Sequence, residues 1–196
     1  MKNKKMIIMI VILISLAIIA TMLLLNKNTK EDDGYKFSQE YTEVSEDNVF
    51  VYRNSDEIIN ILEKGTGVVF LGFPECKWCQ RYAKYLNEVA EDVGIEKIYY
   101  YNIKEDRANN SEFYQKVVNI LTDNLDNDEE GNPRIFVPDV TFVNKGEIVG
   151  HDNETSMESG DVDEYWTEDK IEAVKERLSN YMMEANPNTC NEGCDE

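Results

Sequence analysis

The strongest constraint on the fold is an apolar run, GVVFLGF (67–73), that is followed closely by two cysteines. Because the run is apolar at consecutive positions, both of its faces must be buried, which is typical of a central strand in a sheet covered on both sides. Residues 76–94 then place apolar side chains at helical spacing and end at a glycine, which predicts a helix. Cys76 and Cys79 therefore stand at the junction of a buried strand and a helix.

Strand and helix patterns alternate along the rest of the chain. Strands are predicted at 49–53 and 97–103, a β-hairpin at 139–152 with its turn at 144–146, and helices at 55–64, 111–125 and 167–185, with Ser55 and Thr167 as N-caps of the first and last. This order predicts an α/β domain over residues 46–185, with a mixed β-sheet flanked by helices on both faces.

The N-terminal segment, residues 1–25, predicts a membrane anchor. Three lysines precede twenty residues, 6–25, in which only Ser15 and Thr21 interrupt the apolar sequence. At about 1.5 Å per residue, such a helix spans roughly 30 Å, the thickness of the bilayer hydrocarbon. A cleaved signal peptide is the alternative, but its apolar region usually has only about 7–15 residues and a small-residue cleavage site follows it. We expect an uncleaved transmembrane helix, with the polar residues 26–45 as a tether.

Charge and cysteine usage indicate where the domain lies and what it does not bind. The lysines before the apolar run favour a cytoplasmic N-terminus, and all four cysteines follow the run, which suits an oxidising exterior. We therefore expect a single-pass protein of the cell membrane, in contact with the lipid bilayer and with an extracytoplasmic domain. A net charge of −19 makes a nucleic-acid partner unfavourable.

Three features together resemble the thioredoxin superfamily over roughly residues 46–183. They are the C-x-x-C of Cys76 and Cys79 at a strand-to-helix junction, Val137-Pro138 just before the hairpin, and the hairpin turn at Asn144-Lys145-Gly146. The stretch FLGFPECKWCQRYAKYL is also similar to anchored thioredoxin-like proteins of Gram-positive bacteria, among them the bacteriocin transport accessory proteins. A C-x-x-C alone also occurs in zinc sites, so the proline and the order of elements are needed for the match.

The resemblance implies a redox-active dithiol or disulfide with no cofactor and no metal. Cys76 is then the nucleophile and Cys79 the resolving cysteine, and a cis Pro138 exposes the backbone of Val137 to the substrate chain. Trp78 and Phe73 are candidates for an apolar rim that contacts substrate. The alternatives without a functional role are that Pro138 only shapes a turn and that the aromatic side chains only pack against the domain.

The sequence also departs from that family. Thioredoxin has a buried aspartate six residues before its first cysteine, where this chain has Phe70, and Lys77-Trp78 replaces the usual Gly-Pro between the cysteines. The stretch before Pro138 is longer, with the excess around 121–134. These differences leave the redox potential and the route of the second proton open.

Thiol-disulfide exchange needs a thiolate, and a free cysteine with a pKa of about 8.5 is only slightly ionised at neutral pH. The start of a helix at Cys76 and the neighbouring Lys77 are expected to lower the pKa of Cys76, whereas Glu75 opposes them. Cys79, one turn later, is expected to be more buried. It would attack a mixed disulfide on Cys76 and release the substrate.

Two further candidates lie outside this motif. Cys190 and Cys194, in the acidic tail 186–196, suit a local structural disulfide, with a redox relay or a four-cysteine zinc site as alternatives. His151, the only histidine, is expected to be a solvated loop residue after the hairpin, or else to lie near the active cysteines.

The favoured function is a membrane-anchored thiol-disulfide oxidoreductase. Its partners are protein thiols and disulfides outside the membrane and a membrane or extracellular redox partner. Its direction, as reductase, oxidase or isomerase, is open because it depends on the relative stability of dithiol and disulfide. The alternatives are a non-catalytic accessory or chaperone-like module of an export system, and a metal-handling protein.

Overall fold

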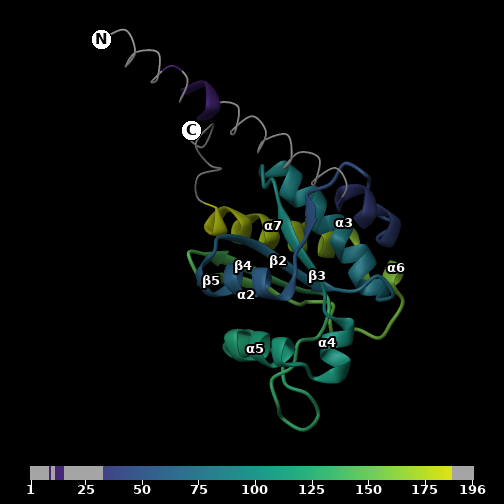
Figure 1. The fold of residues 1–196 in the computed structure, drawn as a ribbon. Helices are drawn as coiled ribbons and strands as arrows, with labels where there is room; N and C mark the ends of the chain where they lie inside the picture. Colours follow the sequence, from purple (N-terminus) through teal and green to yellow (C-terminus); the bar gives the residue numbers. More distant parts are fainter. Residues whose placement is uncertain (1–8, 10–11, 16–32, 187–196) are drawn as a thin grey trace.

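The computed structural model describes residues 9, 12–15 and 33–186 (Figure 1). Most of the predicted anchor, the start of the predicted tether, and both tail cysteines, Cys190 and Cys194, lie outside these residues. Within the described part of the chain, no helix is both long enough and apolar enough to cross a bilayer. The elements in chain order are β1 (Phe50–Tyr52), α2 (Ser55–Lys64), β2 (Gly67–Gly72), α3 (Lys77–Asp92), β3 (Ile98–Asn102), α4 (Lys104–Asn109), α5 (Glu112–Leu121), β4 (Asp139–Asn144), β5 (Glu147–Asp152), α6 (Val162–Tyr165) and α7 (Glu168–Ala185).

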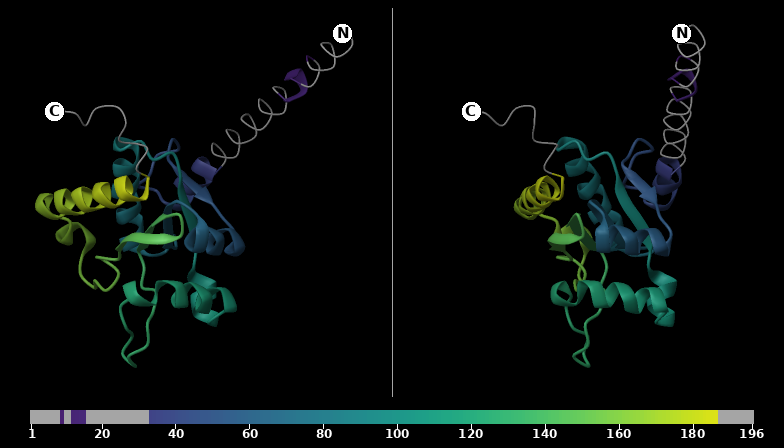
Figure 2. Two further views of the ribbon diagram at one scale, coloured as in Figure 1. Left: turned by 90° about the vertical axis from the view of Figure 1, so that its left-hand side faces the viewer. Right: turned by 60° about the vertical axis from the view of Figure 1, so that its left-hand side comes forward.

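A five-stranded mixed sheet forms the centre of the domain, in the order β1-β3-β2-β4-β5. The first three strands in this order are parallel, and β4 and β5 run antiparallel to their neighbours. Helices α3 and α7 pack together on one side of the sheet, and α4 and α5 lie on the other (Figures 1 and 2). The predicted mixed sheet with helices on both faces is confirmed.

The central strand β2 is buried as its sequence predicts. Residues 68–71, its four consecutive apolar positions, have no exposed surface, because β2 lies between β3 and β4 and is covered from both faces. The loop that follows β2 therefore starts from a well-fixed position at the C-terminal ends of the parallel strands. This is the loop that leads to the cysteines.

The hairpin turn has the backbone conformation that its residues favour. Lys145 and Gly146 have φ values of 54° and 80°, so both lie in the left-handed region used by two-residue hairpin turns. At Gly146 a side chain would also collide with the carbonyl oxygen of Glu63, while the Gly146 N–H donates to the carbonyl of Gly65 at 2.8 Å. The turn predicted at 144–146 is thus confirmed and is fixed to the end of α2.

The helix boundaries differ from prediction in small ways. Asn54, rather than Ser55, caps α2: its side chain accepts a hydrogen bond from the Glu57 N–H, and the Glu57 carboxylate accepts one from the Asn54 N–H. This reciprocal pair satisfies two N–H groups that the helix leaves free, which explains why it displaces the serine. Thr167 caps α7 as predicted, without a side-chain hydrogen bond. The short helices α4 and α6 were not predicted.

The segment before β1 is part of the domain, which corrects the boundary predicted at residue 46. Residues 33–40 form a helix, and Phe37 and Tyr41 have no exposed surface. The Phe37 ring stacks on Tyr41 and on Phe50 of β1, with centroid distances of 4.2 and 3.8 Å. The spacing of four residues between Phe37 and Tyr41 is the signal that these side chains share one face, amid otherwise polar residues.

Candidate active site

The two cysteines lie at the start of α3, where β2 delivers the chain through residues 73–75. Cys76 is the N-cap residue of α3, and its Sγ accepts a hydrogen bond from the Cys79 N–H at 3.1 Å. Both cysteines are free thiols; Cys76 is half-buried, whereas Cys79 is fully buried. The first cysteine is thus reachable from solvent and the second is held behind it by one turn of helix.

The surroundings shift the pKa values of the two thiols in opposite directions. The hydrogen bond from the Cys79 thiol is the largest influence on Cys76 and lowers its pKa, whereas burial raises it. The backbone N–H groups of Cys79 and Trp78 and the charge of Arg107 lower the pKa of Cys76 further. For Cys79, burial raises the pKa well above its ordinary value, and the neighbouring Cys76 raises it further. When the pair carries one negative charge, that charge is therefore favoured on Cys76 rather than on Cys79.

The opposite wall of the site is the segment that enters β4. The peptide bond between Val137 and Pro138 is cis, and the Val137 carbonyl oxygen lies 3.9 Å from the Cys76 Sγ. The pairing of β2 with β4, in which Leu71 lies opposite Asp139, brings this segment beside the loop before Cys76. The structure therefore brings together four of the predicted site residues, Cys76, Cys79, Val137 and Pro138.

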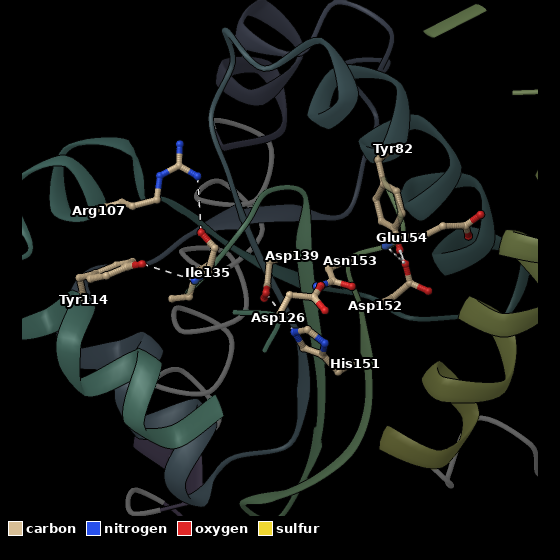
Figure 3. A network of polar contacts seen from close by, with 10 residues as sticks. All are labelled: Tyr82, Arg107, Tyr114, Asp126, Ile135, Asp139, His151, Asp152, Asn153 and Glu154. Atoms are coloured by element: carbon tan, nitrogen blue, oxygen red, sulfur yellow. Dashed lines mark hydrogen bonds and ion pairs between the residues drawn. The ribbon is translucent and has the colours of Figure 1, made fainter. Parts of the chain in front are cut away.

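Arg107, which the sequence did not reveal, is a charged side chain that lowers the pKa of both cysteines. It extends from α4, its guanidinium carbon lies 5.1 Å from the centre of the Phe73 ring, and it donates to the Ile135 carbonyl at 3.5 Å (Figure 3). A single arginine thus contacts both walls of the site. Two sequence signals could have located α4. Acidic residues occupy its first turn, and Asn110, a residue type that tolerates the left-handed conformation, ends it.

Three other predicted site residues occupy positions away from the reacting sulfurs. The Lys77 ammonium donates to the Gly160 carbonyl at 2.7 Å, and Glu75 pairs with Lys104 at 2.6 Å, which lowers the pKa of Glu75. Trp78 is only 6% exposed and packs edge-to-face on Tyr165. The half-buried Phe73 ring is therefore more accessible to a substrate than Trp78.

His151 is not the solvated loop residue that was expected. It lies within β5, opposite Thr141 of β4, and its Nε2 is 3.0 Å from Asp139 Oδ2 (Figure 3). Its side chain is 7% exposed and that of Asp139 is fully buried. Burial lowers the pKa of His151, but the hydrogen bond and charge of Asp139, together with Asp152 and Asp126, outweigh it and leave the pKa raised. Asp139 directly follows Pro138, so this ion pair supports the wall that faces Cys76.

The region beneath β2 on the α3 side is aromatic rather than acidic. Phe70 is fully buried, with its ring centroid 6.0 Å from that of Tyr41 and 5.7 Å from that of Tyr100. The two tyrosine hydroxyls hydrogen-bond to each other at 3.2 Å. Burial is the main reason why the pKa of Tyr41 is far above its usual range, and interaction with Cys79 contributes.

No family model, curated protein or solved structure matches this chain. Within the described residues, no group of three or more histidine, cysteine, aspartate or glutamate side chains is placed to hold a metal ion. The arrangement offers a half-buried thiol with a lowered pKa at a helix N-terminus, and a second, buried thiol one turn behind it. This combination suits nucleophilic attack on sulfur.

Proposed function

We propose that this chain is a thiol-disulfide oxidoreductase of the thioredoxin superfamily, held in the membrane by residues 1–25 and acting outside the cell. The observation that carries the proposal is the unequal pair of thiols: a half-buried Cys76 with a lowered pKa and a buried Cys79 with a raised pKa. The strand order of the sheet, the C-x-x-C between β2 and α3, and a cis-proline before β4 support it.

In the reducing direction the reaction proceeds in two steps. The Cys76 thiolate attacks one sulfur of a substrate disulfide, forms a Cys76–substrate disulfide, and expels the other substrate sulfur as a thiolate. Cys79 then loses its proton and attacks the Cys76 sulfur, which closes the Cys76–Cys79 disulfide and releases the second substrate thiolate. Two electrons pass from the protein to the substrate, and solvent protonates the released thiolates. The same steps in reverse oxidise a substrate dithiol, and a redox partner outside the membrane restores the starting state.

The geometry around Val137 supports a place for the substrate chain. The Val137 carbonyl faces the Cys76 sulfur, so a chain bonded to that sulfur runs beside the Val137 backbone and can form main-chain hydrogen bonds with it. Such bonds depend on the substrate backbone and not on its side chains. They therefore suit an enzyme that accepts protein disulfides in general.

Trapping of the intermediate tests this proposal. Because Cys79 releases the substrate, the variant Cys79→Ser should accumulate mixed disulfides with cell-surface proteins, visible as high-mass bands that disappear on reduction. Cys76→Ser is the matched control and should show none, since the remaining thiol is buried. If neither variant traps a partner and Cys76 reacts no faster than an ordinary thiol, the chain is better explained as a non-catalytic accessory module.

The proposed topology has its own test. Protease added to intact cells should degrade the domain if residues 1–25 anchor it on the outer side of the membrane. Recovery of a soluble, processed form that lacks these residues would contradict the anchor.

A further inference from the structure

Two arginines lie over phenylalanine rings on the two segments that flank Cys76, the loop before it and the strand entry at Val137. Arg107 lies over the ring of Phe73, at 5.1 Å from the centroid, and Arg134 lies over the ring of Phe136, at 5.6 Å. Phe73 lies in the loop before Cys76, and Phe136 directly precedes Val137. Each wall of the site thus carries a guanidinium stacked on a phenylalanine.

Neither of these arginines has an acidic partner within the part of the chain that the structure describes. The other three arginines do: Arg53 pairs with Glu57, Arg81 with Glu43, and Arg177 with Asp152. The chain has 39 acidic residues against 20 basic ones, so chance favours a carboxylate beside every arginine. The two unpaired guanidiniums are therefore a feature of this site and not of the surface as a whole.

The electrostatics of the pair favour an anion from outside. Arg107 is half-buried, and burial together with the charge of Arg134 lowers its pKa. While Cys76 is a thiolate, its charge compensates Arg107 in part. Once Cys76 is bonded to a substrate sulfur, that negative charge is gone, while the half-buried Arg107 still experiences the positive charge of Arg134.

The space next to Arg134 is open to a ligand. Arg134, Phe136 and the exposed Met157 line a hollow of about 470 Å³ together with the loop residues 127–130. Asp128, Glu129 and Glu130 place carboxylates in this lining, and that of Asp128 accepts hydrogen bonds from the N–H groups of Glu130 and Asn132. None of the described carboxylates lies within 4.0 Å of either guanidinium, so these acids leave both arginines available.

From this arrangement we infer that Arg107 and Arg134 bind a carboxylate beside the reacting cysteine of the substrate, so that preferred substrates carry Asp or Glu next to the disulfide. A planar guanidinium suits a carboxylate because it donates two parallel hydrogen bonds. The inference rests on the proposed oxidoreductase function and adds the substrate class to it. It also opposes the effect of overall charge, since a net charge of −19 by itself favours basic substrates.

The test compares three peptide disulfides that differ only in a Glu, Gln or Lys two residues from the cysteine. The reduced full-length protein is mixed with each peptide in single turnover, so no recycling reductant is needed. We expect the Glu peptide to react about five-fold faster than the Gln peptide and the Lys peptide to be slowest, as for a partly exposed charge pair at low ionic strength. Added salt should bring the three rates together.

Variants assign the preference to residues. Arg107→Gln with Arg134→Gln should reduce the Glu-to-Gln rate ratio to about one, and each single variant should reduce it in part. The ratio cancels any change in the reactivity of Cys76 itself. Arg53→Gln is the matched control, because Arg53 also lies over an aromatic ring, that of Tyr99 at 5.3 Å, and this variant should keep the full ratio.

A neutral small disulfide, bis(2-hydroxyethyl) disulfide, separates the two possible failures. If it oxidises the protein while the three peptides react equally, or while the Lys peptide reacts fastest, carboxylate recognition is wrong and the oxidoreductase function stands. If neither the small disulfide nor any peptide reacts, the oxidoreductase function fails and the substrate preference fails with it.

Discussion

Two pairs of titratable side chains lie close to Pro138, and they differ in kind. Cys76 and Cys79 are both acids, so one negative charge on the pair discourages a second, and their pKa values move apart. Asp139 and His151 are an acid and a base, and the attraction between them raises the pKa of His151. In the proposed function the first pair reacts, whereas the second supports the segment that faces Cys76.

The two pairs differ in how far apart their members lie along the chain, and this decides whether local or tertiary structure brings them together. The cysteines are three residues apart in one helix, so local geometry alone fixes their relation. Asp139 and His151 lie on adjacent strands and meet only because Thr141 is paired with His151 across the hairpin. We therefore expect the first pair to control reactivity and the second to control stability.

Removal of His151 should have the largest effect on stability. In His151→Ala, Asp139 would remain fully buried, with one carboxylate oxygen that already has no hydrogen-bond partner among the described residues. Loss of one member of a buried ion pair costs about 3–5 kcal/mol. Urea unfolding of the full chain measures this loss. Asp139→Asn is the matched variant and should cost less, because a neutral imidazole is easier to bury than a carboxylate.

The pH dependence of the stability lost on removal of His151 shows whether Asp139 stabilises the protonated imidazole. Because folding raises the pKa of His151, its contribution to stability is complete below the unfolded value of about 6.5 and is lost as the pH rises through the folded pKa. The stability difference between wild type and His151→Gln should therefore shrink as the pH increases from 5 to 9. A difference that grew with pH would mean that burial of the neutral ring dominates.

The next prediction compares Lys77, the cation that the sequence suggested would activate Cys76, with Arg107, the cation that the structure places near the Cys76 sulfur. Arg107→Gln should slow alkylation of Cys76 at pH 7 by about two- to five-fold, since a partly exposed charge pair contributes up to about 1 kcal/mol. Lys77→Gln is the control and should leave the rate nearly unchanged, because the Lys77 ammonium is directed to Gly160. The reverse order would restore Lys77 as the charge that activates Cys76.

Sequence patterns predicted the parts of the site that are set by neighbours along the chain. The buried strand, the helix that follows it and the exposure of Cys76 relative to Cys79 all depend on periodicity within about twenty residues. Arg107 was missed, the buried His151 was placed in a solvated loop, and residues 33–44 were assigned to the tether instead of the domain. Their positions depend on how α4, the hairpin and the N-terminal helix pack on the sheet. A local signal such as the spacing of Phe37 and Tyr41 indicates a shared face but not the surface that covers it.

The smallest effect is expected from the tail. If Cys190 and Cys194 only close a local ring, changing both to serine should leave the rate with a model disulfide unchanged. A fall of more than about ten-fold, equivalent to roughly 1.4 kcal/mol in the barrier, would instead indicate that they relay electrons to Cys76.

The most direct test of the account is the pH profile of alkylation, resolved by site with mass spectrometry on the reduced full-length protein. The thiolate reacts with iodoacetamide, so the midpoint of each profile reports the pKa of that cysteine. We predict a midpoint for Cys76 clearly below about 8.5, with Cys79 unmodified throughout the neutral range. Equal rates at the two cysteines, or a midpoint for Cys76 at or above that of a free thiol, would contradict the assignment of Cys76 as nucleophile.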